Sequence, residues 1–182
     1  MKFSLIIAGL LSLGLVGCAT TPVQQTSVKF EKVYEVPNLS QAKLYDGVRQ
    51  WYAIAYGSAN AVIQYEDKAV GTIIGKGNMK YPCVGAMDCM TTANARIEFT
   101  SRIDTKDGKV RVTYDSLRYK IPSTVVSGIR YPEVDNPVVE GSKIANNTLK
   151  ALDEMSLDMV SKIQNNETVS YTHLTLPTNS RV

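Results

Sequence analysis

The sequence contains very little histidine and cysteine and almost no excess of charge. Its 182 residues include one histidine, His173, three cysteines and one tryptophan. Apart from His173 there is no imidazole to activate a serine or cysteine nucleophile, and the commonest zinc ligand is missing. Three cysteines exclude a disulfide-dense scaffold, and a net charge of +3 excludes a strongly basic nucleic-acid binder. A content of 44% hydrophobic residues is that of an ordinary globular domain with a real core.

Residues 1–17 have the pattern of a signal peptide. Lys2 supplies a positive charge, and residues 5–16 form an apolar run that is too short for a membrane-spanning helix. The run ends in Leu15-Val16-Gly17-Cys18, which resembles a bacterial lipobox, where small residues precede an obligatory cysteine. The resemblance implies that Cys18 becomes a lipidated N-terminus. An ordinary signal peptide with an incidental cysteine is the alternative.

The lipobox implies an exported protein with residues 18–28 as a tether to the membrane. This segment is small and polar, as expected of a chain that holds a domain away from a bilayer. Ala19, rather than an aspartate, follows the cysteine. By the sorting rule of enterobacteria this favours the inner leaflet of the outer membrane, with the domain facing the periplasm.

Residues 169–182 are not expected to belong to the fold. The run Val169-Ser170-Tyr171-Thr172-His173-Leu174-Thr175-Leu176-Pro177-Thr178 resembles the translation of a transposase adapter used in sequencing libraries. The authentic sequence is then expected to stop near Thr168 and to contain no histidine; a genuine tail is the alternative. Removing Lys2 and Arg181 from the 20 basic residues leaves 18 against 17 acidic ones, a net charge of +1. So small a charge predicts no nucleic-acid partner.

The two remaining cysteines are predicted to form a disulfide. Cys83 and Cys89 enclose five residues, and an exported protein folds in an oxidising compartment. A redox-active pair is the alternative. The spacing is not Cys-x-x-Cys, however, and no helix is expected to start after Cys83.

Residues 29–168 are predicted to form a single α+β domain. The expected elements are a strand over 30–36, a helix from Ser40 to Gly57, strands over 61–66 and 69–77, a hairpin around Asp107-Gly108, and a helix from Gly141-Ser142. Apolar residues recur at helical spacing in both helices: Leu44, Val48, Trp51 and Ala55 in the first, and Ile144, Thr148, Leu152, Met155, Met159 and Ile163 in the second. The order β-α-β-β-β-β-α therefore predicts an antiparallel sheet with helices on one face.

The hairpin is specified in most detail. Asp107-Gly108 is typical of a type I′ turn. Apolar alternation after the turn changes phase once, which predicts a β-bulge at Asp115–Ser116. The register then pairs Lys106 with Lys109, Asp104 with Arg111, Ile103 with Val112, Phe99 with Leu117, Glu98 with Arg118 and Ile97 with Tyr119. The pair of Asp104 and Arg111 is interpreted as a surface ion pair of little energetic weight.

Three segments resemble a known family. They are Tyr34-Glu35-Val36-Pro37, Leu44-Tyr45-Asp46-Gly47-Val48-Arg49-Gln50-Trp51 and Val70-Gly71-Thr72-Ile73-Ile74-Gly75-Lys76-Gly77. With the exported start, they resemble an uncharacterised bacterial lipoprotein family described as a domain of unknown function with a TATA-binding-protein-like (TBP-like) fold, over about Tyr34 to Ile121. The resemblance implies the fold and no catalytic residue. Gly75-Lys76-Gly77 lacks the remaining phosphate-loop spacing, so these glycines are expected to mark close backbone approach.

Two long stretches are expected to be irregular and to supply candidate binding residues. Residues 78–92 contain the predicted disulfide with Tyr81 and Met87, and residues 122–140 contain Ile129 and Tyr131. Loops this long are often functional. The second stretch could pack over the sheet, insert between sheet and helices, or present a surface to a partner. A rigid cover over the edge of the core is an equal alternative for it.

The leading hypothesis is a lipid-anchored cell-envelope protein with a non-catalytic binding or assembly domain and an envelope protein as partner. No metal or cofactor is predicted. A second hypothesis is a carrier of a hydrophobic ligand between sheet and helix, by analogy with helix-grip folds. A third is a hydrolase of envelope polymers, which needs two carboxylates about 5–9.5 Å apart in a cleft.

Overall fold

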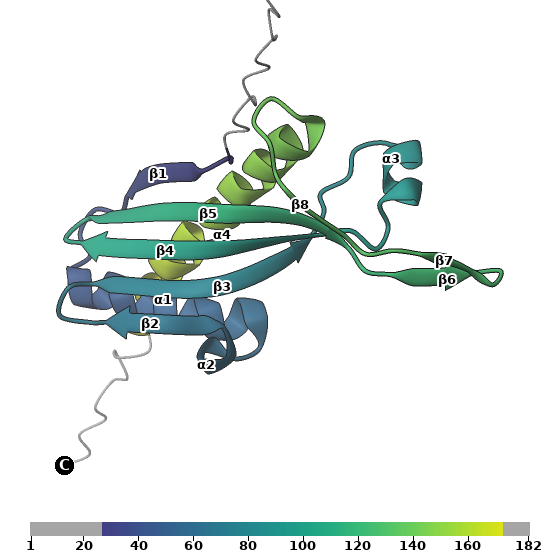
Figure 1. Ribbon diagram of the computed structural model, residues 1–182. Helices are drawn as coiled ribbons and strands as arrows, with labels where there is room; N and C mark the ends of the chain where they lie inside the picture. Colours follow the sequence, from purple (N-terminus) through teal and green to yellow (C-terminus); the bar gives the residue numbers. More distant parts are fainter. Residues whose placement is uncertain (1–26, 173–182) are drawn as a thin grey trace, which may run out of the picture.

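One long hairpin organises the molecule. In the computed structural model, which describes residues 27–172, strands β4 (Arg96–Lys106) and β5 (Lys109–Ile121) form its arms. Three further strands pair with the hairpin and a fourth, β2, pairs with β3, which gives an antiparallel sheet in the order β1-β5-β4-β3-β2 with β8 also on β5 (Figure 1). These are β1 (Phe30–Glu35), β2 (Ile63–Asp67), β3 (Thr72–Lys80) and β8 (Val134–Pro137). β1 and β8 follow one another along the same edge of β5.

The predicted register and bulge of the hairpin are confirmed. Lys106 pairs with Lys109, Asp104 with Arg111, Ile103 with Val112, Glu98 with Arg118 and Ile97 with Tyr119. The register shifts between Glu98 and Thr100, and Thr100 pairs with Asp115. Phe99 therefore faces two residues, Ser116 and Leu117. Ser116 has a φ of 53°, so the extra residue of the bulge lies there.

The predicted type I′ turn at Asp107-Gly108 is wrong, for a tertiary reason. Only Gly108, with a φ of 70°, has left-handed backbone, whereas a type I′ turn needs positive φ at both central residues. The Asp107 carboxylate accepts a hydrogen bond from the backbone N–H of Gln41 at 2.7 Å. Gly108 N–H also donates to the carbonyl of Leu39, at 2.9 Å. The turn is thus shaped by the segment that leads into the first helix.

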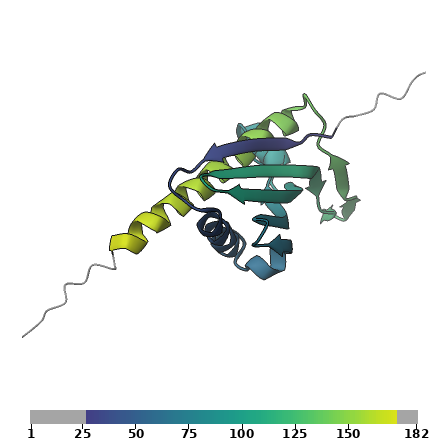
Figure 2. The same ribbon diagram turned by 90° about the vertical axis from the view of Figure 1, so that its left-hand side faces the viewer.

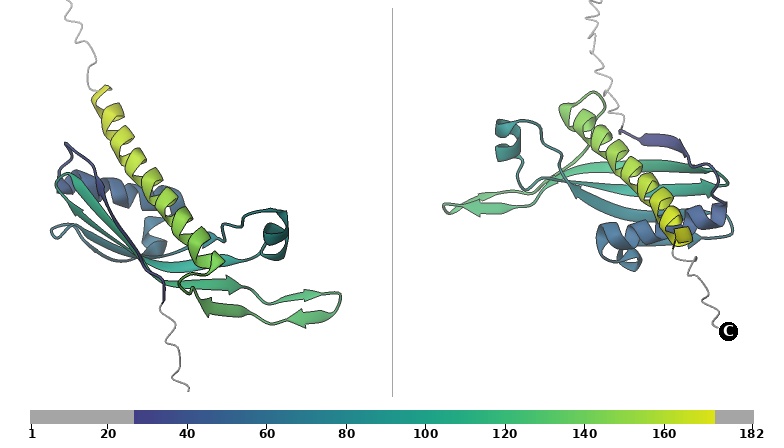
Figure 3. Two further views of the ribbon diagram at one scale, coloured as in Figure 1. Left: turned by 90° about the horizontal axis from the view of Figure 1, so that it is seen from above. Right: turned by 180° about the vertical axis from the view of Figure 1, so that it is seen from behind.

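Helices α1 (Gln41–Tyr56) and α4 (Lys143–Thr172) cover one face of the sheet, as the right-hand view of Figure 3 shows. α1 ends at Gly57, whose φ of 71° gives the predicted left-handed cap. Its buried residues are Leu44, Tyr45, Val48, Trp51 and Tyr52. The prediction that Ala55 faces the core is wrong, since Ala55 is exposed. Tyr56 stacks on Tyr52 there, with ring centroids 5.9 Å apart.

The apolar stripe of α4 is confirmed. Ala145, Thr148, Leu152, Met159, Val160 and Ile163 are buried, and Ile144 and Met155 pack against the core. The backbone of α4 continues to Thr172, past the position near Thr168 where the authentic sequence is expected to stop, and its yellow end extends beyond the sheet (Figure 2). Cys18 and the predicted signal peptide, with residues 173–182, lie outside the described residues.

Glycines mark a close approach of α1 to the sheet, at Gly77, and of α1 to α4, at Gly47. A Cβ at Gly77 of β3 would be 2.6 Å from both the Phe99 ring and the Tyr56 hydroxyl. A Cβ at Gly47 of α1 would be 3.0 Å from Ile163. The space between sheet and helices is therefore filled by protein at these points, as expected of close-packed interiors. This packing counts against a ligand carried between sheet and helix.

The two stretches expected to be irregular contain regular elements. β3 continues through Lys80, and a helix, α3 (Ala86–Thr91), starts after Cys83, contrary to the expectation that no helix would follow. Residues 122–140 contain β8 and a separate hairpin of β6 (Thr124–Val126) and β7 (Ile129–Tyr131). A short helix, α2 (Ala59–Val62), replaces the start of the strand predicted from residue 61. No helix in residues 27–172 is both long and apolar enough to span a bilayer.

The domain begins slightly before the predicted boundary between tether and fold. Val28 is buried, and its N–H donates to the carbonyl of Val138 at 3.2 Å. Ser27 forms a bridge with Val139. The last two residues assigned to the tether thus pair with the segment that follows β8.

Candidate functional site

Two projections leave the same end of the sheet. β3 ends there at Lys80, β4 begins there at Arg96, and β5 ends there at Ile121. The first projection, residues 81–95, contains α3 and is called the α3 loop below. The second, residues 122–133, contains β6 and β7 and is called the arm. Figure 1 shows both extending beyond the sheet on its right-hand side, and together they form what is called the distal end.

The α3 loop is fixed to the body at its base. Cys83 and Cys89 form the predicted disulfide and close the loop around the first turn of α3. The Asp88 carboxylate accepts a hydrogen bond from the Val84 N–H at 2.9 Å and lies 3.3 Å from the Lys143 ammonium at the start of α4. The Val84 N–H, followed by Lys143, lowers the pKa of Asp88. The disulfide therefore closes the loop on itself, and the ion pair of Asp88 with Lys143 joins the loop to the helix that covers the sheet.

Tyr81 belongs to this base, and its prediction as a binding residue is wrong. Its side chain is buried and packs edge-to-face on Tyr119, with ring centroids 5.5 Å apart. Its hydroxyl accepts a hydrogen bond from the side-chain amide of Asn147 at 3.0 Å. Tyr81 therefore positions the loop and offers no surface to a ligand.

The arm is a two-stranded hairpin with one regular turn. Ser127 and Gly128 have φ values of 51° and 81°, the two positive values of a type I′ turn. Ile129 and Tyr131 lie on one face of β7, since residues two apart in a strand point the same way. They are 61% and 50% exposed, and Val125 on β6 is 60% exposed. The arm thus presents apolar side chains to solvent, as a surface that binds a partner would.

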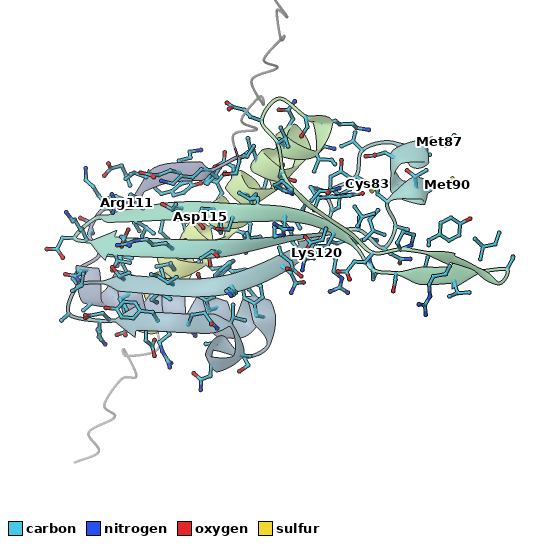
Figure 4. The ribbon with its side chains drawn as sticks, in the orientation of Figure 1. Cys83, Met87, Met90, Arg111, Asp115 and Lys120 are labelled. Atoms are coloured by element: carbon cyan, nitrogen blue, oxygen red, sulfur yellow. A yellow bond between two sulfur atoms is a disulfide. The ribbon has the colours of Figure 1, made fainter. Side chains whose placement is uncertain are left out.

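Large apolar side chains gather at the distal end. Among the described residues, eleven large hydrophobic side chains are exposed, and six of them are here: Val84, Met87, Met90, Val125, Ile129 and Tyr131. Figure 4 shows Met87 and Met90 at the outer end of α3, away from the sheet. An open hollow of about 420 Å³ lies beside them, between α3 and Lys143. Such a gathering of exposed apolar residues is typical of a protein-binding surface.

The open sheet face near the turn between β4 and β5 has a different character. Asp104 of β4 accepts hydrogen bonds from Arg102, Arg111 and the Thr72 hydroxyl, at 3.1, 2.8 and 2.8 Å. Burial alone would raise the pKa of Asp104, but these three donors outweigh it and hold the pKa at about 2. The interpretation of Asp104 and Arg111 as an isolated surface pair is therefore wrong, because the Asp104 side chain is only 13% exposed. These ion pairs stabilise the sheet, and the one carboxylate is shared by two arginines.

Three surface hollows of the described residues each contain one carboxylate. Asp104 lies in a hollow of about 190 Å³ with Lys106 and Lys109, and Glu98 in one of about 400 Å³ over the bulge. Asp88 lies in the hollow beside α3. None of the three brings together the two carboxylates that a glycoside hydrolase uses. Within residues 27–172, no three histidine, cysteine or acidic side chains are grouped to hold a metal ion.

Part of the distal end could be predicted from the sequence. Of the candidate binding residues, Met87, Ile129 and Tyr131 are exposed, and the structure adds Val84, Met90 and Val125 to them. The Ser127-Gly128 dipeptide between β-branched residues was the available signal for a two-residue hairpin turn. It would have indicated the arm and its outward-facing side chains.

The sheet order with α1 and α4 on one face defines a TBP-like protein. Residues 30–120 match the family described as a domain of unknown function (DUF4468) with TBP-like fold, and the chain belongs to this family. The match agrees with the predicted extent from about Tyr34 to Ile121. It ends before the arm.

Two solved structures share the fold. A TBP-like protein from Parabacteroides distasonis ATCC 8503 has a TM-score of 0.56 at 15% identity, covering 76% of this chain and 94% of that one. A DUF4468 family protein from Bacteroides ovatus ATCC 8483 has a TM-score of 0.52 at 18% identity, covering 75% of this chain and 86% of that one. None of the curated proteins matches the chain.

Proposed function

We propose that this chain is a lipid-anchored protein of the cell envelope whose TBP-like domain binds an envelope protein without catalysis. The observation that carries the proposal is the gathering of six exposed apolar side chains at the distal end, on two projections from one end of the sheet. Burying such side chains in an interface is favourable by about 25 cal/mol per Å² of apolar area. The partner would supply the second layer that the distal end lacks.

The two projections suit recognition in different ways. The disulfide and the ion pair of Asp88 with Lys143 hold the α3 loop before binding, so little ordering entropy is lost when a partner docks. Met87 and Met90 are flexible and polarisable, which lets them adapt to a partner surface. The arm offers Ile129 and Tyr131 from a hairpin whose edges are free to add a strand. Tyrosine in such a position is a frequent anchor of interfaces.

The anchor rests on Cys18. If Cys18 is acylated, residues 18–26 lie between the bilayer and Ser27, where the chain joins the sheet. Nine residues reach about 30 Å when fully extended. A tether of this length would keep the domain near the membrane while leaving the distal end free to meet a partner in the periplasm.

Site-specific photo-crosslinking in intact envelopes tests the binding surface. A photoreactive residue replaces Ile129 or Met87, and the control position is Leu157 on α4, which is 49% exposed but lies outside the distal end. We expect one partner to be crosslinked from both distal positions and not from Leu157. That partner is then purified, and its affinity for the domain is expected to fall at least about tenfold with Ile129→Asp and to stay unchanged with Leu157→Asp. Equal crosslinking from Leu157, or equal affinities of the two variants, would contradict the proposal.

Metabolic labelling tests the anchor separately. Radiolabelled palmitate is expected to mark the wild-type chain in the membrane fraction and not the Cys18→Ser variant. An unlabelled, unprocessed precursor that stays soluble inside cells would overturn the anchor and leave the crosslinking result to stand on its own.

A further inference from the structure

Three cations lie side by side on the open face of the sheet, next to the distal end. In the strand register Lys80 on β3 faces Arg96 on β4, and Arg96 faces Lys120 on β5. Figure 4 shows Lys120 where the arm leaves the sheet. Neighbouring strands are about 4.8 Å apart, so the three residues start within about 10 Å of one another. Like charges that face each other across strands destabilise a sheet.

The nearby acidic residues are already engaged by other cations. Lys120 lies 2.9 Å from Glu98 and 3.6 Å from Asp135. Arg118 lies 2.6 Å from Asp135. Glu98 of β4 lies on the same face of the sheet as Lys80, Arg96 and Lys120, and Lys120 neutralises its carboxylate. These pairs account for Lys120 and Arg118 but not for the other cations.

At this end of the sheet, three cations of β3 and β4 have no acidic partner among the described residues. They are Lys80, Arg96 and Lys76, which lies four residues before Lys80 on the same face of β3. Arg96 donates to the side-chain oxygen of Asn78 at 3.4 Å, a long and neutral contact. All three side chains are exposed. An unneutralised charge of +3 therefore remains over a small area of an otherwise balanced chain.

A polar hollow of about 400 Å³ adjoins these cations. The inserted residue of the bulge, Ser116, lies on its wall. Its lining is Lys76, Gly77, Asn78, Glu98, Phe99, Thr100, Ser116 and Arg118. The hydroxyl of Thr100 and the side-chain amide of Asn78 can donate hydrogen bonds to an anion held there.

We propose that Lys76, Lys80 and Arg96, with the polar groups of this hollow, form a binding site for a ligand that carries two or more phosphate charges. Arginine pairs with phosphate oxygens through two parallel hydrogen bonds, and lysine adds a point charge. Lys80 and Arg96 start about 5 Å apart on neighbouring strands, and Lys76 lies about 13 Å from Lys80 along β3. A ligand with two or more phosphates can reach all three long side chains, whereas a single carboxylate would neutralise only one of them. The site is separate from the apolar surface of the distal end. The phosphates could belong to a lipid headgroup or to a soluble compound.

Calorimetric titration with inorganic pyrophosphate tests the site. The full chain with Cys18→Ser is used throughout, at constant ionic strength. We expect saturable binding, and a dissociation constant about tenfold or more higher in Lys80→Gln/Arg96→Gln, since charge-assisted hydrogen bonds are lost. The matched control is Lys106→Gln/Lys109→Gln, which removes two lysines that also face each other, near the turn of β4 and β5. This control is expected to bind within twofold of the parent chain.

A second readout does not depend on the ligand. Without any anion, Arg96→Gln is expected to raise the melting temperature by about 1–3 °C, because it removes repulsion across the strands. Absence of saturable pyrophosphate binding together with a lowered melting temperature would overturn the proposal. Equal loss of binding in both double variants would also overturn it.

Binding to vesicles and to an acidic peptide distinguishes a lipid headgroup, a soluble phosphate compound and an acidic protein segment as the ligand. Phosphatidylcholine vesicles with and without diphosphatidylglycerol are sedimented with the same variants. Binding that requires diphosphatidylglycerol, Lys80 and Arg96 supports a lipid headgroup, and binding of pyrophosphate alone supports a soluble ligand. A polyglutamate peptide that binds more tightly than pyrophosphate would overturn the phosphate assignment in favour of an acidic protein segment. None of these outcomes depends on the partner of the distal end.

Discussion

The body and the distal end hold similar apolar side chains in opposite environments. Leu152 and Met159 of α4 are fully buried against the sheet, whereas Met87 and Met90 of α3 are 76% and 77% exposed. Residue type does not account for this difference, because methionine occurs in both places. In the body a second layer covers the sheet, and at the distal end no second layer of the described residues covers α3 or the arm. An apolar face without a covering layer is what a binding partner completes.

The two projections differ from each other as well. The α3 loop is closed on itself by the disulfide, and Tyr81 and the ion pair of Asp88 with Lys143 tie it to the body. The arm consists of β6 and β7, which pair only with each other. Two-stranded hairpins are marginally stable alone in water. The stability of the distal end should therefore decrease from the loop to the arm, and mutations should reveal that gradient.

Removing a buried side chain from the body should lower the free energy of unfolding more than any other change. Leu152→Ala is expected to lower the free energy of unfolding by about 2–5 kcal/mol, since it deletes a fully buried side chain and leaves a cavity. Urea denaturation measures the change. Leu157→Ala, on the exposed side of the same helix, is the control and should change stability by less than about 0.5 kcal/mol. Equal effects of the two substitutions would mean that α4 does not pack on the sheet as described.

Opening the disulfide should cause the next largest loss in the free energy of unfolding. The Cys83→Ser/Cys89→Ser variant is expected to lose about 2 kcal/mol, the loop-closure entropy of so short a ring. Urea denaturation of the wild type with a reducing agent should give the same loss, and the reductant should not affect the variant. A loss of less than about 0.5 kcal/mol would show that the contacts of Tyr81 and Asp88 hold the loop without the disulfide.

Much of the fold could be predicted because it depends on short-range patterns. The alternation of Ile97, Phe99 and Ile103 with charged residues determines which face of β4 is buried, and one change of phase determines the bulge. The turn type failed because it depends on Gln41, which lies 66 residues before Asp107 and donates to its carboxylate. Such a contact leaves no mark in the local pattern.

The candidate site could be predicted only as two stretches of chain. Tyr81 and Met87 lie six residues apart in one loop and are both large and apolar, so composition could not separate them. What separates them is Asn147 on α4, which binds the Tyr81 hydroxyl from 66 residues away. The row of Lys80, Arg96 and Lys120 was likewise hidden, because it appears only once the register of three strands is known.

Charges on the open face of the sheet should have an intermediate effect that depends on pH. The pKa of Asp104 is about 2 in the fold against 3.8 ordinarily, so its contribution of about 2 kcal/mol is complete above pH 4. It should disappear as the pH falls from about 4 to 2, because the carboxylate is then protonated in both states. Urea denaturation of wild type and Asp104→Asn at pH 6 and at pH 2.5 measures this. The difference between the proteins should shrink at the lower pH, and a constant difference would contradict the assignment.

Mutations in the arm should have the smallest effect on stability. Ile129→Ala/Tyr131→Ala removes side chains that are 61% and 50% exposed, so the free energy of unfolding is expected to change by less than about 0.5 kcal/mol. Hydrogen exchange should show the amides of β6 and β7 exchanging faster than those of β4 in both proteins, since the arm opens without unfolding the sheet. The same variant should lose binding to the partner captured through Ile129. A stability loss above about 1 kcal/mol would instead mean that the arm packs on the body in solution, and the distal end would then not be an open binding surface.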